Sequence, residues 1–241
     1  MGVFSKFDAE AYPHWYEGTL VVGVLVGGIP QDPKIVESWI RTKLRDTRSD
    51  AEIQELIAST MAERGISEDD AIVKAAGSLV GVNSFKRDAR GLHIEGRQLK
   101  AALKEAAMVA VNAGKISAEK WGKPDNATYK KGIKGWLPEH IFVVEETLYI
   151  YKEGKPDPVT EVDGTIQKFI HTHRGDSIGY EQYVRDAEIR FTVKTDHELT
   201  EKQWGMIWLT GELQGLGASR SQEYGRYEVT KWERIPPPKG K

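Results

Sequence analysis

The tightest constraint on the fold is a short alternating segment near the C-terminus. Between residues 187 and 195, apolar side chains occupy every second position. The apolar set is Ile189, Phe191 and Val193, and the polar set is Glu188, Arg190, Thr192 and Lys194. Because successive side chains of a β-strand point to opposite faces, this pattern predicts a strand with one face on a core.

The residues after this strand reduce the number of folds that the chain can adopt. Thr200 can cap a helix over residues 201–213, a glycine-rich loop occupies 215–225, and 226–233 is typical of another strand. Strand, helix, glycine loop and strand are one half of a split βαβ unit. We therefore predict an α+β fold with a ferredoxin-like (RRM-like) split βαβ core, carrying helical and β-hairpin (thumb) insertions.

The rest of the chain supplies elements of both kinds. Residue patterns predict strands at 19–26, 141–151 and 165–173, a helix at 98–111, a polar turn at 83–91, and loops at 114–138 and 174–176. Residues 50–78 have helical spacing and no recognisable chemistry, so we expect a helical insertion there. No repeat or second linker is present, which predicts a single domain over residues 1–241.

Composition excludes several classes of protein. Cysteine is absent, which excludes disulfides and cysteine-ligated zinc. The longest apolar run, residues 20–29, includes three glycines and is shorter than the ~18–20 residues of a membrane span. The N-terminus lacks a signal-peptide pattern. We therefore expect a cytoplasmic protein with no membrane partner.

Charge is distributed unevenly along the chain. The formal net charge is −2. Residues 32–74 contain 7 basic and 10 acidic side chains, residues 86–134 contain 12 and 5, and residues 220–241 contain 6 and 3. The last two segments are therefore net positive and can present a basic surface to a polyanion. The alternative is that they are ordinary solvated faces.

Two groups of residues are candidates for binding phosphate. In the glycine loop, glycines let backbone amides approach an anion closely, and arginines can pair with it. The loop lacks the Walker lysine, and its position between a helix and a strand reverses the order of a dinucleotide fingerprint. The candidates are Gly215, Gly217, Ser219, Arg220 and Arg226 in this loop, and Lys86, Arg87, Arg90, Arg97, Lys100 and Lys104 upstream. Helical spacing places the last three on one face of a helix start.

These segments resemble the motifs of the CRISPR-associated RAMP superfamily. Residues 85–104 read FKRDARGLHIEGRQLKAALK, which is similar to that family's short strand followed by Pro-Gly-Ser-Ser-Leu-Lys-Gly-Ala-Leu-Arg. The loop at 215–225, followed by a strand, resembles the family's C-terminal glycine-rich loop. The sequence departs from the pattern at Glu95, which replaces the proline, at Arg97 and Gln98, which replace the serines, and at Ala101, which replaces a glycine.

The resemblance implies a function, with two alternatives. A single fold of this size is similar to the effector backbone subunit, the "Cas seven" group, which binds guide RNA and oligomerises along it to present it for target pairing. The implied partners are guide RNA, target nucleic acid, copies of the chain and other CRISPR effector subunits, and residues 141–184 would hold the thumb. The alternatives are a RAMP-type ribonuclease, which slices target or processes guide, and a general single-strand nucleic-acid-binding protein.

Catalytic candidates are few. By the resemblance, Asp32 occupies the place of a target-cutting aspartate, although an aspartate before a proline is equally typical of a helix start. No cofactor is expected unless Asp32 is catalytic, when a divalent metal would be needed. His14 lies near Tyr12 and Tyr16, a grouping that resembles the histidine–tyrosine chemistry of guide-processing RAMP nucleases. His171 and His173 share a strand face, but the sequence names no third metal ligand for them. We therefore predict no metal site.

Overall fold

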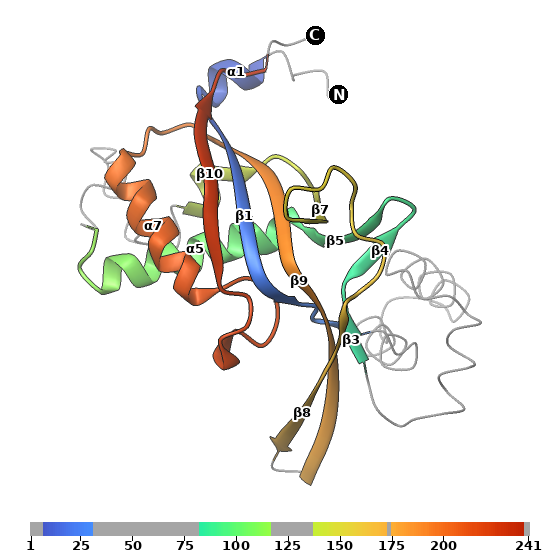
Figure 1. Cartoon of the computed structure of the whole chain (residues 1–241). Helices are drawn as coiled ribbons and strands as arrows, with labels where there is room; N and C mark the ends of the chain where they lie inside the picture. Colours follow the sequence, from blue (N-terminus) through green and yellow to red (C-terminus); the bar gives the residue numbers. More distant parts are fainter. Residues whose placement is uncertain (1–6, 31–81, 117–136, 173–174, 239–241) are drawn as a thin grey trace, which may run out of the picture.

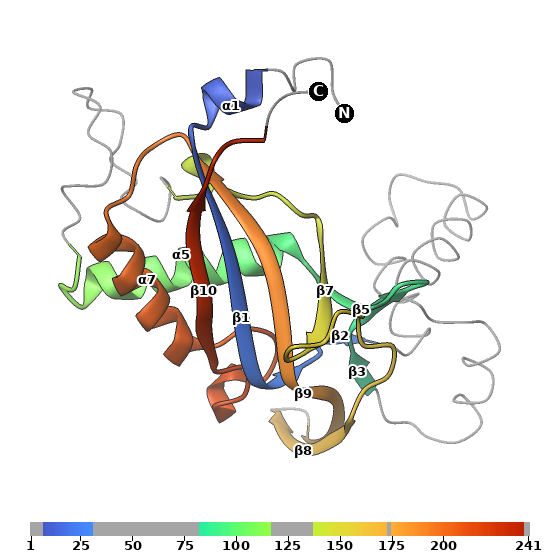
Figure 2. The ribbon, with the colours of Figure 1, turned by 45° about the horizontal axis from the view of Figure 1, so that its top comes forward.

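The computed structural model describes residues 7–30, 82–116, 137–172 and 175–238. Within these residues ten strands form one sheet. The two long helices are α5 (Gly96–Asn112) and α7 (Glu201–Gln214). They pack on each other, and α5 crosses behind the central strands (Figures 1 and 2). The predicted α+β class is therefore confirmed, with strands predominating.

The long strands define the middle of the sheet. β1 (His14–Val26) lies between β10 (Tyr227–Ile235) and β9 (Gly175–Thr195), and is antiparallel to both. On the other side of β9 follow β7 (Thr147–Lys152), β5 (Gly91–Glu95) and β4 (Lys86–Asp88), giving the order β10-β1-β9-β7-β5-β4. His14 pairs with Thr195 and Val26 pairs with Tyr183, so β1 spans most of the length of β9.

Short elements complete the described fold. These are α1 (Asp8–Ala11), β2 (Ile29–Pro30), β3 (Val82–Ser84), β6 (Ile141–Val143), β8 (Gly164–Thr172) and the 3-10 helix η3 (Arg220–Gln222). β2 pairs with β3, and β3, β6 and β8 each pair with β9. No helix in the described residues is both long and apolar enough to cross a membrane.

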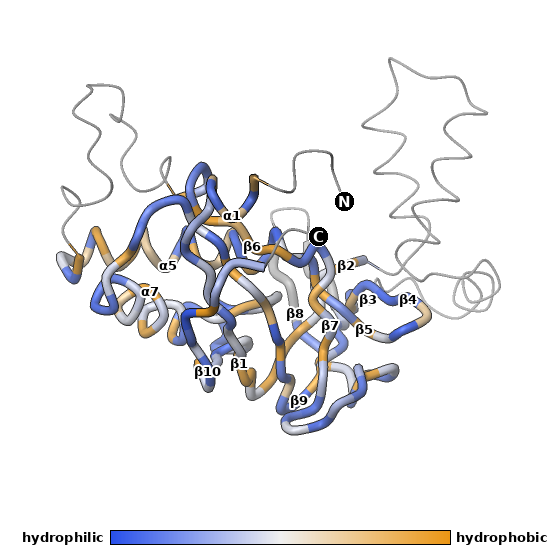
Figure 3. The backbone as a smooth tube through the Cα atoms, turned by 90° about the horizontal axis from the view of Figure 1, so that it is seen from above, coloured by the Kyte–Doolittle hydropathy of each residue, from blue (hydrophilic) through white to orange (hydrophobic). Residues whose placement is uncertain are grey.

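The core lies between the sheet and the two helices. Ile189, Phe191 and Val193 are buried, as the alternation predicts. Small residues of α5 let α7 approach closely, and Trp204 and Trp208 of α7 fill the remaining space against the sheet. Figure 3 shows apolar and hydrophilic stretches alternating along the central strands. This packing fixes the position of each helix, and therefore of both its ends, relative to the sheet.

Two loop predictions were wrong. The polar segment 83–91 contains most of β3, all of β4 and the first residue of β5, joined by a tight turn at Ala89 and Arg90 in which the Asp88 carboxylate accepts the amides of Arg90 and Gly91. Strands of three residues are too short to show a hydrophobic period, so only their pairing reveals them. Gly175 and Asp176 belong to β9, because the β8–β9 pairing continues to Thr172 and Gly175.

The predicted insertions have different outcomes. Residues 50–78 lie outside the described part of the chain. The range 141–184 contains β6 and β7, which pair with β9 within the sheet, as well as a hairpin of β8 with the first part of β9. That hairpin, residues 164–183, extends past the end of β1 (Figure 1). The thumb therefore stays a prediction, and within the predicted range this hairpin is the part that extends beyond β1.

Candidate nucleic-acid interface

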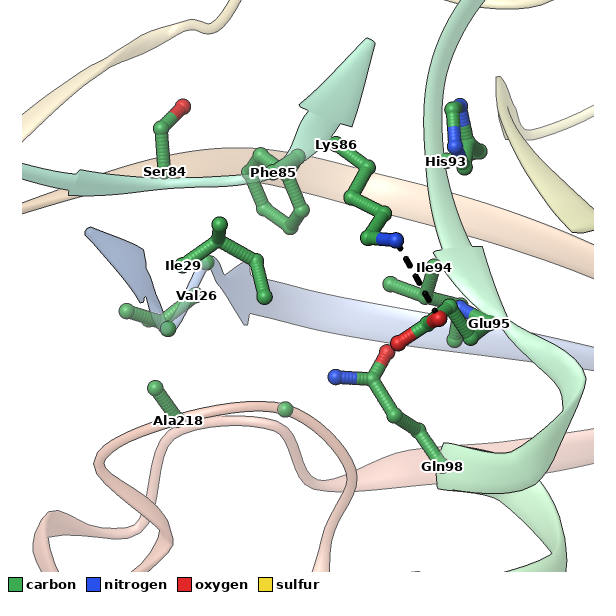
Figure 4. A pocket seen from close by; sticks show the side chains of 13 residues that line it. Val26, Ile29, Ser84, Phe85, Lys86, His93, Ile94, Glu95, Gln98 and Ala218 are labelled. Carbon is green, nitrogen blue, oxygen red and sulfur yellow. Dashed lines mark hydrogen bonds and ion pairs between the residues drawn. The ribbon is translucent and has the colours of Figure 1, made fainter. Parts of the chain in front are cut away.

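One pocket joins parts of the chain that are distant in sequence. Its volume is about 120 Å³, and it lies where β1 ends, β5 leads into α5 and the glycine loop turns (Figure 4). Residues 26–29 form one part of the lining. Lys86, Glu95 and Gln98 come from the upstream motif, and Gly217 and Ala218 come from the glycine loop. Both sequence motifs therefore meet beside the turn that follows the first long strand.

The glycine loop is held against β1 by backbone hydrogen bonds. The amides of Ala218 and Gly225 donate to the carbonyls of Val26 and Val24, both at 2.9 Å. Gly217 has φ +89°, and a Cβ there would lie 2.7 Å from the Val26 carbonyl oxygen, so only glycine fits without strain. In the described part of the chain the Gly217 amide donates no hydrogen bond. This amide borders the pocket and can donate to an anion.

An ion pair with a buried carboxylate anchors the same loop from the hairpin side. Lys168 of β8 lies 2.5 Å from the carboxylate of Glu181 in β9, and Glu181 is only 4% exposed. The Ser219 hydroxyl donates to that carboxylate and accepts from the Lys168 ammonium group at 2.7 Å. Ser219 is therefore a link between the glycine loop and the hairpin, rather than an open phosphate ligand.

Both predicted arginines of the glycine loop have carboxylate partners. Arg220 donates to Glu105 of α5 at 2.7 Å, and Arg226 donates to Glu223 at 2.8 Å. The Arg220 side chain is 35% exposed, so part of its guanidinium group faces solvent beside the loop. A guanidinium group has five N–H donors, so one carboxylate does not exhaust its capacity to bind phosphate.

The upstream motif places a three-residue charge cluster at the start of α5. Glu95 accepts hydrogen bonds from Lys86 at 3.2 Å and from Arg97 at 2.6 Å and 2.8 Å. Figure 4 shows the Lys86–Glu95 contact inside the pocket. Burial acts to raise the pKa of Glu95, but the hydrogen bonds from Arg97 and Lys86 and their charges outweigh it. The pKa of Glu95 is therefore lowered, and its carboxylate is anionic near neutral pH.

Glu95 also caps the helix that follows it. Glu95 and Gln98 form a capping box, in which the Glu95 amide donates to the Gln98 side chain at 3.1 Å. The first turn of a helix favours an anion because its amides and its dipole point outward. Glu95 therefore occupies the position where we expected a bound phosphate, which changes the role predicted for this helix start.

The predicted basic row on α5 does not form one open face. Arg97 is 78% exposed, whereas Lys100 donates to the Pro138 carbonyl at 2.7 Å and lies 4.1 Å from the centre of the Phe142 ring. Burial lowers the pKa of Lys100. Lys104 is partly buried and, like Lys100, does not line the pocket. Helical spacing was correct, but β6 covers part of this face.

Two further basic candidates lie on the β4–β5 hairpin, outside the pocket lining. Arg87 lies 3.5 Å from the carboxylate of Glu161. Arg90 lies over the ring of Tyr149, 4.2 Å from its centre. Of the eleven predicted binding residues, the pocket lining includes only Lys86 and Gly217. The others surround these motifs or lie further away.

Sequence reasoning missed several residues of this region. His93 is buried and lines the pocket, and Glu181 and Lys168 support the glycine loop. Only His93 carried a local signal, because it lies inside the recognised motif. The roles of Glu181 and Lys168 depend on hairpin pairing. The β8–β9 register places residues 168 and 181 near each other, which their separation in sequence does not show.

Within the described residues, the pocket lining includes none of the predicted catalytic candidates. Asp32 and His173 lie outside the described residues, and the side chain of His171 is not described. His14 lies 2.9 Å from Arg234 at the start of β1, whereas the pocket adjoins the other end of that strand. Tyr16 is buried and stacks on Trp232. The histidine–tyrosine grouping at residues 12–16 is therefore separate from the pocket.

Comparison with known proteins finds similarity among solved structures. No protein-family model and no curated protein matches the sequence. Among solved structures, a chain in the cryo-EM structure of the Type III-B Cmr-beta bound to cognate target RNA is similar to this protein, with a TM-score of 0.46 and 11% sequence identity. The match covers 95% of this chain and 63% of that chain, so this protein spans less than two thirds of the length of that chain.

Proposed function

We propose that the protein is an RNA-binding component of a CRISPR effector complex, and specifically a backbone subunit that oligomerises along the guide RNA and presents it for target pairing. One observation carries this proposal. The segments 85–104 and 215–225 each resemble a RAMP motif, and both contribute to one pocket although more than a hundred residues separate them. A chance resemblance in two unrelated loops would not require them to meet.

The topology supports a ferredoxin-like core for this subunit. The strands β10, β1, β9 and β7 are neighbours in that order, and all are antiparallel. Helix α5 lies between β1 and β7 in the chain, and α7 lies between β9 and β10. Two strand–helix–strand units interleaved in this way form a split βαβ arrangement. In this proposal, β4, β5 and the β8–β9 hairpin are additions to the core.

The pocket rim has the chemistry for gripping a nucleic-acid backbone. The Gly217 amide and the side chains of Lys86, Arg97 and Arg220 provide hydrogen-bond donors at or near the pocket, and carboxylate partners hold the three side chains in position. Contacts of this kind fix phosphates and carry no base information. The subunit would therefore hold any guide sequence, as a backbone subunit must.

The hairpin and the partners follow from the same proposal. The hairpin at residues 164–183 extends beyond β1 and is the best candidate for a thumb that reaches a neighbouring copy. Guide RNA, target nucleic acid, further copies of this chain and other effector subunits would then assemble with it in the cytoplasm. RNAs of increasing length should bind stepwise larger numbers of copies, one for each fixed nucleotide interval. Binding without a regular interval would contradict the backbone role.

Two separate arginine substitutions, one in the glycine loop and one far from it, test whether the loop binds phosphate. Arg220→Ala should weaken RNA binding and lower the salt slope by about 0.7, the value for one single-strand phosphate contact. The loss should be equal for two RNAs of unrelated sequence. Arg234→Ala is the matched control, because Arg234 also pairs with a glutamate but lies where β10 meets the opposite end of β1 from the pocket.

Each outcome of this comparison is informative. A loss confined to one RNA would mean that the loop reads bases, and equal behaviour of the two variants would remove Arg220 from the interface. Binding of single-stranded DNA as tightly as RNA, without regular spacing, would instead favour a general single-strand-binding protein.

Target cleavage is a second candidate function, favoured by one feature of the pocket. Residues 26–29 line it, and Asp32 follows three positions after Ile29 in the chain. Asp32→Asn should leave RNA assembly unchanged and abolish target cleavage in the assembled complex. Cleavage that survives the substitution would remove Asp32 as a catalytic residue, and cleavage by the isolated chain would favour a guide-processing ribonuclease.

A further inference from the structure

A cluster of three metal-ligating side chains lies at the other end of the sheet. His140 directly precedes β6, and Asp196 and His197 directly follow β9. Ile141 of β6 pairs with Thr195 of β9, so the strand register itself places His140 beside Asp196. Strand pairing therefore brings together side chains that lie 56 positions apart in sequence. No sequence spacing could reveal this group, and we predicted no metal site.

The donor atoms already converge in the structure. The Asp196 carboxylate bridges the two imidazoles, with Oδ2 at 2.8 Å from Nδ1 of His140 and Oδ1 at 2.9 Å from Nδ1 of His197. One ligand atom from each residue lies within 4.8 Å of the others. His140 is only 9% exposed, whereas His197 faces solvent. Among the described residues, no other trio of histidine and carboxylate side chains is grouped in this way.

We propose that His140, Asp196 and His197 bind one divalent ion of the zinc class. Two imidazole nitrogens and one carboxylate oxygen are a ligand set typical of zinc, which leaves a fourth tetrahedral position for water. Bonds of about 2.0 Å at tetrahedral angles place donors about 3.3 Å apart. The two imidazole nitrogens lie 3.0 Å and 2.9 Å from Oδ1 of Asp196, so these two separations need to widen by only a few tenths of an ångström. Each imidazole then binds through Nδ1 and carries its proton on Nε2. Magnesium and calcium prefer all-oxygen sites and are disfavoured here.

The ion would clamp β6 to the end of β9. Asp196 and His197 lie a few positions before Thr200, which caps α7. The clamp would therefore also secure the start of that helix relative to the sheet. The site is independent of the RNA pocket. The β1 register runs from His14, paired with Thr195, to Val26 at the pocket, which is twelve residues or about 40 Å at ~3.3 Å per residue.

Zinc titration of the full chain tests this assignment. After treatment with a chelator, the protein should bind one Zn²⁺ per chain by calorimetry, and its melting temperature should rise with added zinc. Cobalt should give the ligand-field spectrum of a nitrogen- and oxygen-ligated tetrahedral site. His197→Ala and Asp196→Asn should each weaken zinc binding by at least ~100-fold, the upper range for losing even an outer partner of a metal site.

The controls separate a built site from loose binding by surface histidines. His197 is exposed, so its truncation should leave the fold intact, which circular dichroism checks. His14→Ala is the matched control, because His14 lies opposite Thr195 at the same end of the sheet but outside the cluster. Zinc binding that is absent in the wild type, or that is equal in His197→Ala and the wild type, would overturn the proposal. RNA binding measured on the same variants should be unchanged, so this inference and the proposed function can fail separately.

Discussion

At the first turn of α5, Glu95 holds Lys86 on one side and Arg97 on the other. The carboxylate lies within the pocket lining, where it neutralises cations that could otherwise bind phosphate. An uncharged residue at this position would leave both cations without this carboxylate partner. The charge of Glu95 therefore lowers the positive charge at the pocket.

Replacing Glu95 tests this interpretation at the scale of one residue. Glu95→Gln keeps an oxygen that can cap α5 and removes the negative charge, so RNA should bind more tightly. The salt slope should rise by about 0.7 for each cation that is released to a phosphate. Glu198→Gln is the matched control, because it releases Arg234 far from the pocket. Affinity that falls or stays constant in Glu95→Gln would show that the Lys86–Glu95–Arg97 cluster is purely structural.

At the scale of elements, long periodic segments were predictable and short ones were not. The apolar spacing located α5, α7 and β10 to within two residues, and Thr200 caps α7 as expected. The segment 187–195 proved to be the second part of β9, whose first part pairs with β8. Single-strand patterns contain no information about pairing partners, so β3 and β6 depend on contacts that only the folded chain provides.

Two glycines of α7 should respond to the same substitution in opposite directions. Gly205 is exposed and a Cβ there meets nothing within 4 Å, so Gly205→Ala should stabilise the protein by about 0.5–1 kcal/mol through helix propensity. At Gly211 a Cβ would overlap the hydroxyl of Tyr227, which is buried. Gly211→Ala should therefore destabilise by about 1–3 kcal/mol through overpacking.

Urea denaturation of both variants measures this difference. The two positions share one helix and one chemical change, so each is the control for the other. Equal effects would mean that packing between α7 and β10 is looser at Gly211 than the structure shows.

At the scale of the whole molecule, the sum of formal charges over a sequence segment overstates how positive the protein surface is. Residues 86–134 have an excess of basic side chains, yet Arg87 pairs with Glu161 and Lys100 is covered near Phe142. The glycine loop behaves similarly, because Glu105 reaches Arg220 from another element. Sequence therefore located the two motifs that form the pocket, but it could not predict the carboxylates that moderate their charge. Those partners come together only through tertiary packing.

Four carboxylates that accept hydrogen bonds in the folded chain make the stability of the whole fold sensitive to acid. Asp88, Glu95, Asp163 and Asp196 each have a lowered pKa. Burial acts to raise each of these pKa values, but hydrogen bonds and neighbouring charges outweigh it. The ordinary values are 3.8 for aspartate and 4.5 for glutamate. As the pH falls through these ordinary pKa values, the four carboxylates therefore bind protons more readily in the unfolded chain than in the folded chain.

This difference fixes the direction of the pH dependence. Carboxylates with lowered pKa values stabilise the folded state fully above their unfolded values, and this contribution is lost as pH falls through the folded values. The free energy of unfolding should therefore be nearly constant down to about pH 5 and then decline steadily toward pH 3. Urea denaturation across this range in the presence of a chelator measures it. Asp163→Asn keeps the oxygen that accepts from the Arg185 amide but cannot titrate, so the decline should be shallower, whereas the exposed Asp157→Asn should follow the wild type. A decline of equal steepness in both variants would show that the Asp163 interactions contribute nothing to acid sensitivity.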